Sequence, residues 1–399
     1  MDYPKSIPGS GLVDGKFVDE DAIAGTPGSL IPASWGNSVT QEILGAITAA
    51  GLKPDEAQTD QLAQAIRQLS KPDPLQQFPA QVYRRNVLIN GGFDIWQRGT
   101  TNQGPNIGGY VADRFRCDWN GNAGVAISQQ SFAPGQSEVA DEPQFFLRWQ
   151  QTQAGTAATV HRVSQAVESV RTLAGKTATV TFWARSDAAR PLRVSVIQNF
   201  GSAGSESVEK TVDVFQLGTS WKKFSATFRL SGIAGKMLGA NNFLRLAFDL
   251  PLNVLQTVDL AQIQLEEGPV STPFEYRPVA EELMLCQRYF EKSFATWLPV
   301  RANNGSGTCI SSFTQAAPAN SGQFAMTVGM LVQKRVLPTV VMYCPGNTGN
   351  QVWNQTVGAC TGSIVQGSTE RAISFATVTP VGSLPGQTLQ IEWTADAEL

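Results

Sequence analysis

The feature that most constrains the fold is a set of short β-branched and aromatic segments in the middle of this 399-residue chain. Residues 177–185 read Thr-Ala-Thr-Val-Thr-Phe-Trp-Ala-Arg, and residues 192–197 and 221–230 repeat the pattern at short spacing. Such side chains favour pleated strands, and 37 glycines and 22 prolines supply turns between them. We therefore expect a mainly β chain in which residues 81–278 form a two-sheet sandwich or jelly roll.

The region before this sandwich, residues 1–80, predicts an extended segment followed by two short amphipathic helices. The first helix is expected after Ser38, with Gln41 completing a capping box, and the second from near Thr59 to just before Pro72. Helices of about a dozen residues are marginal in water without a partner. The segment is therefore expected to associate with copies of itself or with a larger assembly; the alternative is a cap folded onto its own domain.

The region after the sandwich predicts a helical connector at 279–293 and, at 294–399, a distal β-sandwich domain that is expected to bind the receptor. The distal domain has only four basic and four acidic residues and is rich in Gly, Ser, Thr, Asn and Gln, so neutral polar ligands or identical subunits suit it better than salt bridges. Its expected strands are residues 324–328, 336–343, 372–378 and 388–393. No fixed-period repeat is present, which disfavours a long parallel β-helix.

The composition excludes several classes of function. A net charge of −3 argues against a charge-driven nucleic-acid binder, and no apolar run reaches about 18 residues, so no membrane insertion is expected. The first ten residues lack a secretory signal. The five cysteines form no CxxC pair and are expected to be free thiols, while the single histidine, His161, is expected to be a packed or surface residue.

An ordered series of motifs strongly resembles a jelly-roll domain of tailed-phage tail fibres, which is similar to carbohydrate-binding modules. The series opens with Asn-Val-Leu-Ile-Asn-Gly-Gly-Phe-Asp-Ile-Trp-Gln-Arg-Gly at 86–99 and closes with Val-Asp-Leu-Ala-Gln-Ile-Gln-Leu-Glu-Glu-Gly at 258–268 and Thr-Pro-Phe-Glu-Tyr-Arg-Pro at 272–278. Between them lie matching strings at 110–115, 173–176, 182–184 and 220–223. The flanks at 29–37, 285–290, 335–340 and 393–399 resemble other parts of such fibres.

The resemblance implies a homotrimeric phage tail fibre, a receptor-binding protein of the virion tail. Such a fibre is assembled in the host cytoplasm, attaches to the tail tip or baseplate through residues 1–80, and adheres to lipopolysaccharide or similar glycans at the bacterial surface. A phage-tail-like bacteriocin would use the same chain. The alternatives are a glycan-depolymerising tailspike enzyme and a structural tail spacer without receptor contact. We expect no enzyme activity and no catalytic residues.

Candidate receptor contacts combine aromatic rings, which stack on sugar faces, with amides that bind hydroxyls. In the sandwich the candidates are Asn120 and Trp119, whose polar neighbours Asp118, Asn120 and Asn122 suggest exposure; the alternative for Trp119 is core packing. Trp183 and Trp221 are expected in the core. In the distal domain the candidates are Tyr343, Asn347, Asn350, Trp353 and Asn354. The alternative there is that the amides cap turns and the rings pack at a subunit interface.

Related carbohydrate-binding modules often hold a structural calcium, and the matching positions are Asp94 and Asp259. Two carboxylates are only part of the six to eight oxygens that calcium prefers. If no ion is bound, Asp94 makes a turn hydrogen bond and Asp259 pairs with a base. No other cofactor is expected. The adjacent pairs at 266–267 and 281–282 are expected to be solvated, because glycoside hydrolysis needs two acids across a cleft.

Overall fold

The computed structural model describes residues 9, 11–14, 16–23, 25, 27–70, 84–105, 108–296, 298–300, 309–312, 323–344, 351–378, 384 and 387–399. The chain divides into two compact units, residues 1–82 and 83–399, and each is described by itself.

The first unit holds two helices, α1 (Ala33–Ala49) and α2 (Gln61–Leu69). The predicted capping box at Ser38 is wrong: the helix begins directly after Pro32, and the Ser38 hydroxyl lies within it and donates to the Ser34 carbonyl at 3.0 Å. Several large apolar side chains of the two helices are exposed, namely Ile43, Leu44, Leu62, Ile66 and Leu69. Among the helices described, none is both long and apolar enough to cross a membrane.

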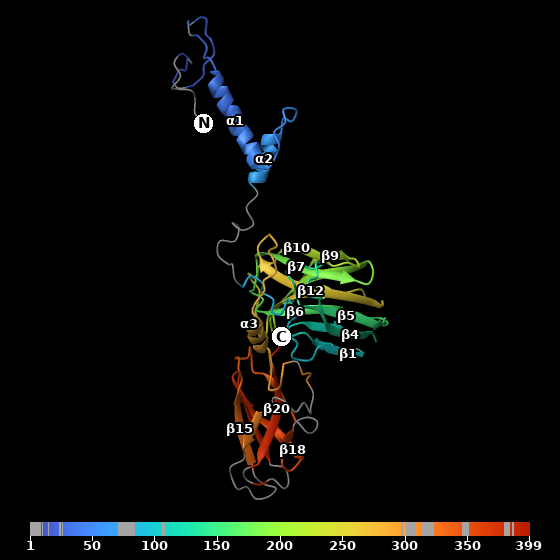
Figure 1. Cartoon of the computed structure of the whole chain (residues 1–399). Helices are drawn as coiled ribbons and strands as arrows, with labels where there is room; N and C mark the ends of the chain where they lie inside the picture. Colours follow the sequence, from blue (N-terminus) through green and yellow to red (C-terminus); the bar gives the residue numbers. More distant parts are fainter. Residues whose placement is uncertain are drawn as a thin grey trace. The chain divides into compact units, whose positions relative to one another are not determined.

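The second unit begins with a sandwich of two six-stranded sheets (Figure 1). The first sheet has the order β1 (Thr101–Pro105), β4 (Gly124–Ser131), β5 (Phe145–Gln153), β12 (Gln256–Glu267), β7 (Thr177–Ser186), β10 (Lys222–Arg229). The second has the order β2 (Gly109–Tyr110), β3 (Arg116–Trp119), β6 (His161–Glu168), β11 (Phe243–Asp249), β8 (Arg190–Asn199), β9 (Val208–Leu217). The strands predicted at 177–185, 192–197 and 221–230 are confirmed as β7, β8 and β10, and the mainly β class is confirmed with them.

Alternation along the strands builds the core between the sheets. Phe182 and Phe248 are both fully buried and meet edge to face across the core at 5.0 Å between ring centroids. Their sequence neighbours Trp183 and Asp249 point to the outside of the sandwich, as expected for a period of two. Each sheet therefore presents an outer face whose residues are set by the same register that fills the core.

A side-chain clamp fastens the two ends of the sandwich segment to each other. The Asn86 amide donates to the Ile263 carbonyl and accepts from the backbone N–H groups of Leu88 and Leu265. Gly91 lies so close to β12 that a Cβ there would come within 2.1 Å of the Ile263 carbonyl oxygen. Arg277 donates to the carbonyls of Asn86 and Leu88. The opening and closing motifs are therefore parts of one structural device, which we call the clamp.

After the clamp, helix α3 (Val279–Gln287) leads into an eight-stranded third sheet. Its main path is β13 (Phe290–Lys292), β20 (Thr388–Asp396), β17 (Gln351–Asn354), β18 (Ala359–Ser368), β19 (Ala372–Val378), β15 (Gln323–Gly329), and both β14 (Cys309–Ser312) and β16 (Thr339–Tyr343) pair with β20. The four distal strands predicted from the sequence are confirmed. Helix α3 ends at Gln287, before the end of the helical connector predicted at 279–293, because Phe290 already pairs with Asp396 of β20.

Arginines join the last residues of the chain to the sandwich. Arg98 donates to Asp113 of the sandwich and to Asp396, both at 3.1 Å, and the buried Arg114 pairs with Glu398 and stacks over the Tyr289 ring. Burial leaves few waters to solvate these charges, so their pairing is needed for stability.

Candidate functional site

The outer face of the second sheet carries four arginines from four adjacent strands, Arg116 (β3), Arg162 (β6), Arg193 (β8) and Arg245 (β11). We call this surface the arginine face. Each of these arginines alternates with a core residue, as Arg162 does with Val163 and Arg245 with Leu246. The side-chain periodicity of two therefore places all four on one surface.

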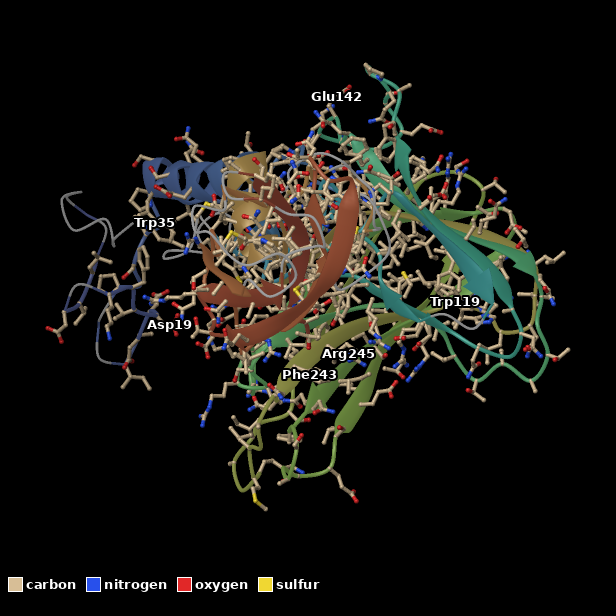
Figure 2. All side chains as sticks on the ribbon, turned by 90° about the horizontal axis from the view of Figure 1, so that it is seen from below. Asp19, Trp35, Trp119, Glu142, Phe243 and Arg245 are labelled. Carbon is tan, nitrogen blue, oxygen red and sulfur yellow. The ribbon has the colours of Figure 1, made fainter. Side chains whose placement is uncertain are left out.

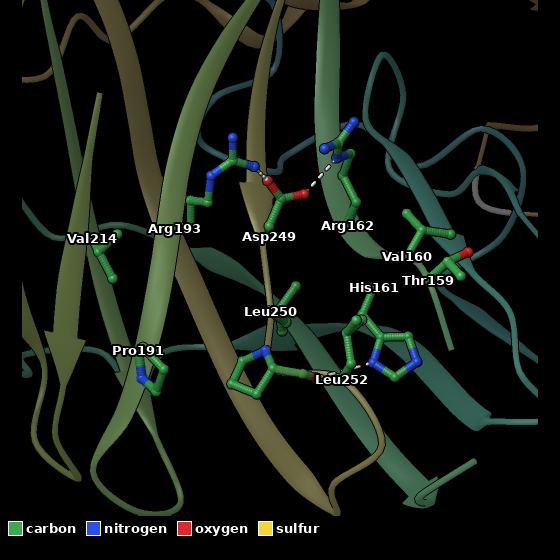
Figure 3. Close-up of a pocket in the computed structure, with 11 residues that line it drawn as sticks. Thr159, Val160, His161, Arg162, Pro191, Arg193, Val214, Asp249, Leu250 and Leu252 are labelled. Atoms are coloured by element: carbon green, nitrogen blue, oxygen red, sulfur yellow. Dashed lines mark hydrogen bonds and ion pairs between the residues drawn. The ribbon is translucent and has the colours of Figure 1, made fainter. Parts of the chain in front are cut away.

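A groove of about 360 Å³ crosses this face at the ends of β6, β8 and β11 (Figure 3). In the groove the Asp249 carboxylate lies between two arginines, accepting from Arg162 Nε at 2.5 Å and from Arg193 at 2.7 Å. Arg193 also donates to Glu209 at 2.6 Å and to the Thr211 hydroxyl at 3.0 Å. The groove thus has a hydrogen-bonded, charged wall.

The opposite side of the groove is apolar. Pro191, Val214 and Leu252 line it, and the exposed fractions of Val214 and Leu252 are 48% and 40%. His161, at the base, is buried; its Nδ1 lies 3.0 Å from the Pro251 carbonyl oxygen, so the expectation of a packed histidine is confirmed. A shallow groove with one apolar and one hydrogen-bonding wall suits a ligand that has both kinds of surface, as a sugar ring does.

Arg116 and Arg245 extend the arginine face beyond the groove. Arg116 Nε donates to both oxygens of Asp118, at 2.8 and 3.1 Å. Arg245 lies over the Phe243 ring at 4.7 Å (Figure 2), and no hydrogen bond or ion pair joins it to any described residue. Burial lowers the pKa of Arg245, the nearby Tyr110 and Asp118 raise it, and the positive charges of Arg116 and Arg162 lower it by smaller amounts. An unpaired guanidinium is therefore held beside two others.

The outer face of the first sheet is different in kind. There Phe132, Phe146 and Trp221 form a compact ring cluster with centroids 4.8 to 5.3 Å apart, and Trp183 packs against it; we call this surface the aromatic face. Trp183 and Trp221 were expected in the core between the sheets, but both rings lie on the outer side of the first sheet. Trp221 is nevertheless buried, at 8% exposure, by the rings around it.

Neither residue of the sandwich that was predicted to contact a glycan is available to it. Trp119 is 3% exposed and meets Trp149 edge to face inside the core, so its prediction as an exposed platform is wrong. The polar neighbours that suggested exposure alternate with it and face outward. The Asn120 amide donates to the Thr159 hydroxyl and accepts from two backbone N–H groups, which assigns it to a turn.

The pair proposed for calcium does not fit the ion. Both oxygens of Asp259 accept hydrogen bonds from Arg148 and Arg185, at 2.8 to 2.9 Å, which confirms the alternative that Asp259 pairs with a base. Two guanidinium groups in contact with the carboxylate would repel a cation. Burial raises the pKa of Asp94, which also disfavours its charged, metal-binding form. Over the described ranges, no group of three or more His, Cys, Asp or Glu could hold a metal ion.

Two of the distal candidates, Tyr343 and Trp353, lie on strands β16 and β17, which pair with β20 at Glu392 and Gln390. Tyr343 lines a cavity of about 450 Å³ together with Phe290 and Val341, and pairs with Glu392 of β20. Trp353 is half-buried and pairs with Cys360. Asn354 is fully buried and accepts from two backbone N–H groups of its turn, so the alternative that it caps a turn applies. Asn347 and Asn350 lie outside the described residues.

The adjacent carboxylates also have structural partners. Glu266 is fully buried and bonded to Thr272, Glu267 pairs with Lys176, and Glu282 pairs with Arg277. None of these pairs spans a cleft. The expectation of solvation is wrong for Glu266 and Glu282, which are buried because Thr272 donates to Glu266 and the Asn90 backbone N–H donates to Glu282.

Sequence reasoning missed the arginine face altogether. Its residues are spaced two apart on separate strands, so no local string marks them. The signal was present as an arginine at alternating positions of β3, β6, β8 and β11, but it becomes a surface only when the strand order β3-β6-β11-β8 is known.

The four cysteines described in full are free thiols, as expected: Cys117, Cys286, Cys344 and Cys360. Burial raises the pKa of Cys360 to about 12, so this thiol is protonated near neutral pH.

No protein-family model and no curated protein matches this sequence. Among solved structures the chain is similar to the enzymatically active domain of tailspike protein 4 of bacteriophage CBA120, at 13% identity and a TM-score of 0.28, over 46% of this chain and 22% of that one. It is also similar to a xylan-binding domain from Paenibacillus barcinonensis, at 17% identity and a TM-score of 0.27, over 39% of this chain and 92% of that one. A family 11 carbohydrate-binding module from Clostridium thermocellum gives 12% identity and a TM-score of 0.29, over 44% and 99%. TM-scores this low carry no functional inference.

Proposed function

We propose that this protein is a non-catalytic glycan-binding adhesin of the tail-fibre kind, and that the groove on the arginine face is where its sandwich meets a bacterial surface polysaccharide. In this proposal residues 1–80 attach to a tail tip or baseplate. Three copies assemble into a fibre on the virion tail, and the distal domain extends the contact through Tyr343 and Trp353.

The observation that carries the glycan-binding part is the make-up of the groove. Leu252 and Val214 offer exposed apolar surface on one side, and on the other Arg162, held through its Nε by Asp249, offers its terminal amino groups as donors. Guanidinium forks bind sugar oxygens directly, and the apolar wall suits the C–H face of a ring. The tail-fibre part is supported by the ordered motifs from 86–99 to 272–278.

Weak single sites are sufficient in such an assembly. A trimer brings three grooves to one surface, and several fibres multiply that number, so contacts of millimolar affinity give durable attachment when they act together. The exposed apolar side chains Ile66 and Leu69 of α2 are a surface that self-association would cover.

Absence of catalysis belongs to the same proposal. Both oxygens of Asp249 accept from arginines, so neither oxygen is placed to protonate a glycosidic bond. Its nearest charged neighbours in the groove are arginines rather than a second acid.

The test is incubation of the full chain with surface polysaccharides from a panel of candidate hosts, scoring retention and newly released reducing ends in the same samples. We expect retention without release. The double variant Leu252→Ala/Val214→Ala should lose most of the retention, whereas Lys223→Ala, an exposed change on the other sheet, should not. Release of reducing ends would replace the adhesin with a glycan-cleaving enzyme, and no retention on a panel that includes the host would favour a structural spacer.

A further inference from the structure

We propose that the arginine face binds an anionic sugar residue, one that carries a carboxylate or a phosphate group, between Arg116, Arg162 and Arg245. This inference rests on the proposed function and specifies the class of glycan that the face selects.

The strand register places the three arginines around one residue, Ser164. Arg116 on β3 lies directly opposite Ser164, and Ala247 on β11 lies opposite it on the other side. Arg162 is two residues before Ser164 on β6, and Arg245 is two residues before Ala247. Side chains directly opposite in a sheet lie about 5 Å apart and diagonal ones about 7 Å apart, so Arg116 is the nearest of the three to Ser164, Arg245 is its diagonal neighbour, and Arg162 flanks it along β6.

The arginines keep their best donors free. Arg116 and Arg162 each use only Nε, toward Asp118 and Asp249, and Arg245 donates to no described residue. The terminal amino groups of all three therefore have no partner within the described part of the chain. A planar guanidinium with its amino groups free presents the paired donors that match carboxylate and phosphate oxygens.

The hydroxyl of Ser164 is buried beside the arginines. Ser164 is 1% exposed, and its hydroxyl has no hydrogen-bond partner among the described residues, although it shares the outer face with the arginines. Ala247, beside it, is fully buried and adds no polar group. A buried hydroxyl without a partner costs stability, and a bound anion between the arginines would supply the acceptor that the hydroxyl lacks.

The charge balance of the face selects an anion over a neutral sugar. Asp118 pairs with Arg116, Asp249 is shared by Arg162 and Arg193, and Glu209 pairs with Arg193. These three acids face four arginines, and Arg245 is the one without a direct ion pair, because the nearby Asp118 is bonded to Arg116. Binding a carboxylate or phosphate there would compensate this charge, whereas a neutral hydroxyl would not.

The experiment follows the arginine Nε–Hε resonances of the full chain by NMR during titration with sodium glucuronate, glucose 6-phosphate, inorganic phosphate and glucose. Glucuronate and glucose share one ring and differ in the carboxylate, so they separate charge from ring contacts. We expect millimolar binding of the anionic probes, with shifts at Arg116, Arg162 and Arg245 and none with glucose. Shifts with glucuronate but not with inorganic phosphate would show that the site binds sugars that carry a carboxylate. Equal shifts with both would show that it binds any small oxyanion.

Variants give the quantitative test. Arg245→Gln and Arg116→Gln should each weaken glucuronate binding by about tenfold, while Arg229→Gln, an exposed arginine on β10, should leave it unchanged. Absence of arginine shifts with every anionic probe, or equal weakening by Arg229→Gln, would overturn the inference.

The same samples separate this inference from the proposed function. If the host polysaccharide is retained equally before and after chemical reduction of its carboxylates and removal of its phosphates, the adhesin stands and the anion site fails. If glucuronate shifts the three arginines but no polysaccharide is retained, the anion site stands and the adhesin fails.

Discussion

The two outer faces of one sandwich use arginine in opposite ways. On the aromatic face Arg148 and Arg185 converge on one buried carboxylate, Asp259, and Arg185 also lies over the Trp221 ring at 4.9 Å. On the arginine face the guanidinium groups spread over four strands, and Arg245 makes no ion pair with any described residue. On the aromatic face the guanidinium groups are bonded to a carboxylate of the protein, whereas on the arginine face some N–H donors stay available to a ligand.

The difference shows that residue type alone does not identify a binding surface. The aromatic face has the rings that sugar binding calls for, yet Trp221 and Phe146 are 8% and 5% exposed because they pack on each other. The arginine face has few rings but retains open hydrogen-bonding capacity. Incomplete bonding, rather than composition, distinguishes a surface built for a ligand from one built for stability.

The largest expected effect is the loss of the ring cluster. Trp221→Ala should lower the free energy of unfolding by about 3 kcal/mol, because it removes a buried indole, and should leave glycan retention unchanged in the variant that remains folded. Urea unfolding and the retention assay measure the two quantities, with Lys223→Ala as the control. If retention falls in folded protein, the aromatic face takes part in binding and the contrast between the faces fails.

The second effect compares the two shared carboxylates. The Asp259 side chain is 4% exposed, so Asp259→Asn leaves Arg148 and Arg185 without their counter-charge. This should lower the free energy of unfolding by about 2 kcal/mol. Asp249→Asn, at 19% exposure, should cost about 1 kcal/mol because water reaches its arginines. It should also strengthen glucuronate binding, since it removes a negative charge from the arginine face. Weaker anion binding in Asp249→Asn would mean that the carboxylate positions Arg162 for the ligand.

The third effect is of opposite sign. Ser164→Ala removes a buried hydroxyl without a described partner and should stabilise the protein by about 1 kcal/mol, while weakening glucuronate binding. Ser225→Ala, at an exposed position of β10, corrects for the change in strand propensity. A destabilised Ser164→Ala protein would show that the hydroxyl already has a partner in the free protein.

The smallest effect is a pH dependence on the arginine face. Burial raises the pKa of Glu209, but hydrogen bonding and charge from Arg193 outweigh it, so the net pKa is lowered from 4.5. A lowered pKa means that the contribution to stability is present above pH 4.5 and is lost as the pH falls through the folded-state value. The stability difference between the wild type and Glu209→Gln should therefore shrink between pH 6 and pH 3. Parallel stability curves over this range would contradict it.

Most of the fold could be predicted from the sequence because strand signals are local. The segment 177–185 alternates so strongly that β7 was found to within one residue, and the glycine-bounded turns located its neighbours. The prediction failed where a local signal was ambiguous. Ser38 is a residue type that often caps a helix, but α1 begins directly after the extended Pro32, six residues before Ser38.

The candidate site could not be predicted, because it depends on strand order. Trp119 was chosen for its polar neighbours, but alternation turns the ring inward and only those neighbours outward. Arg116 and Arg245 are 129 positions apart in sequence and are brought near Ser164 by pairing of both flanking strands with β6. A single sequence does not reveal which strands pair. It therefore predicts local motifs such as those of the clamp more readily than a binding surface assembled from several strands.

The clamp has a mechanical consequence. Because Arg277 donates to the carbonyls of Asn86 and Leu88, a pulling force that enters at residue 86 and leaves at residue 277 is borne first by these hydrogen bonds and by those that join Asn86 to β12. The two sheets therefore share the pulling force with the clamp and do not carry all of it strand by strand. Tension along the chain would therefore pass the sandwich without shearing β6 against β11, and the arginine face would keep its geometry while the chain is under strain.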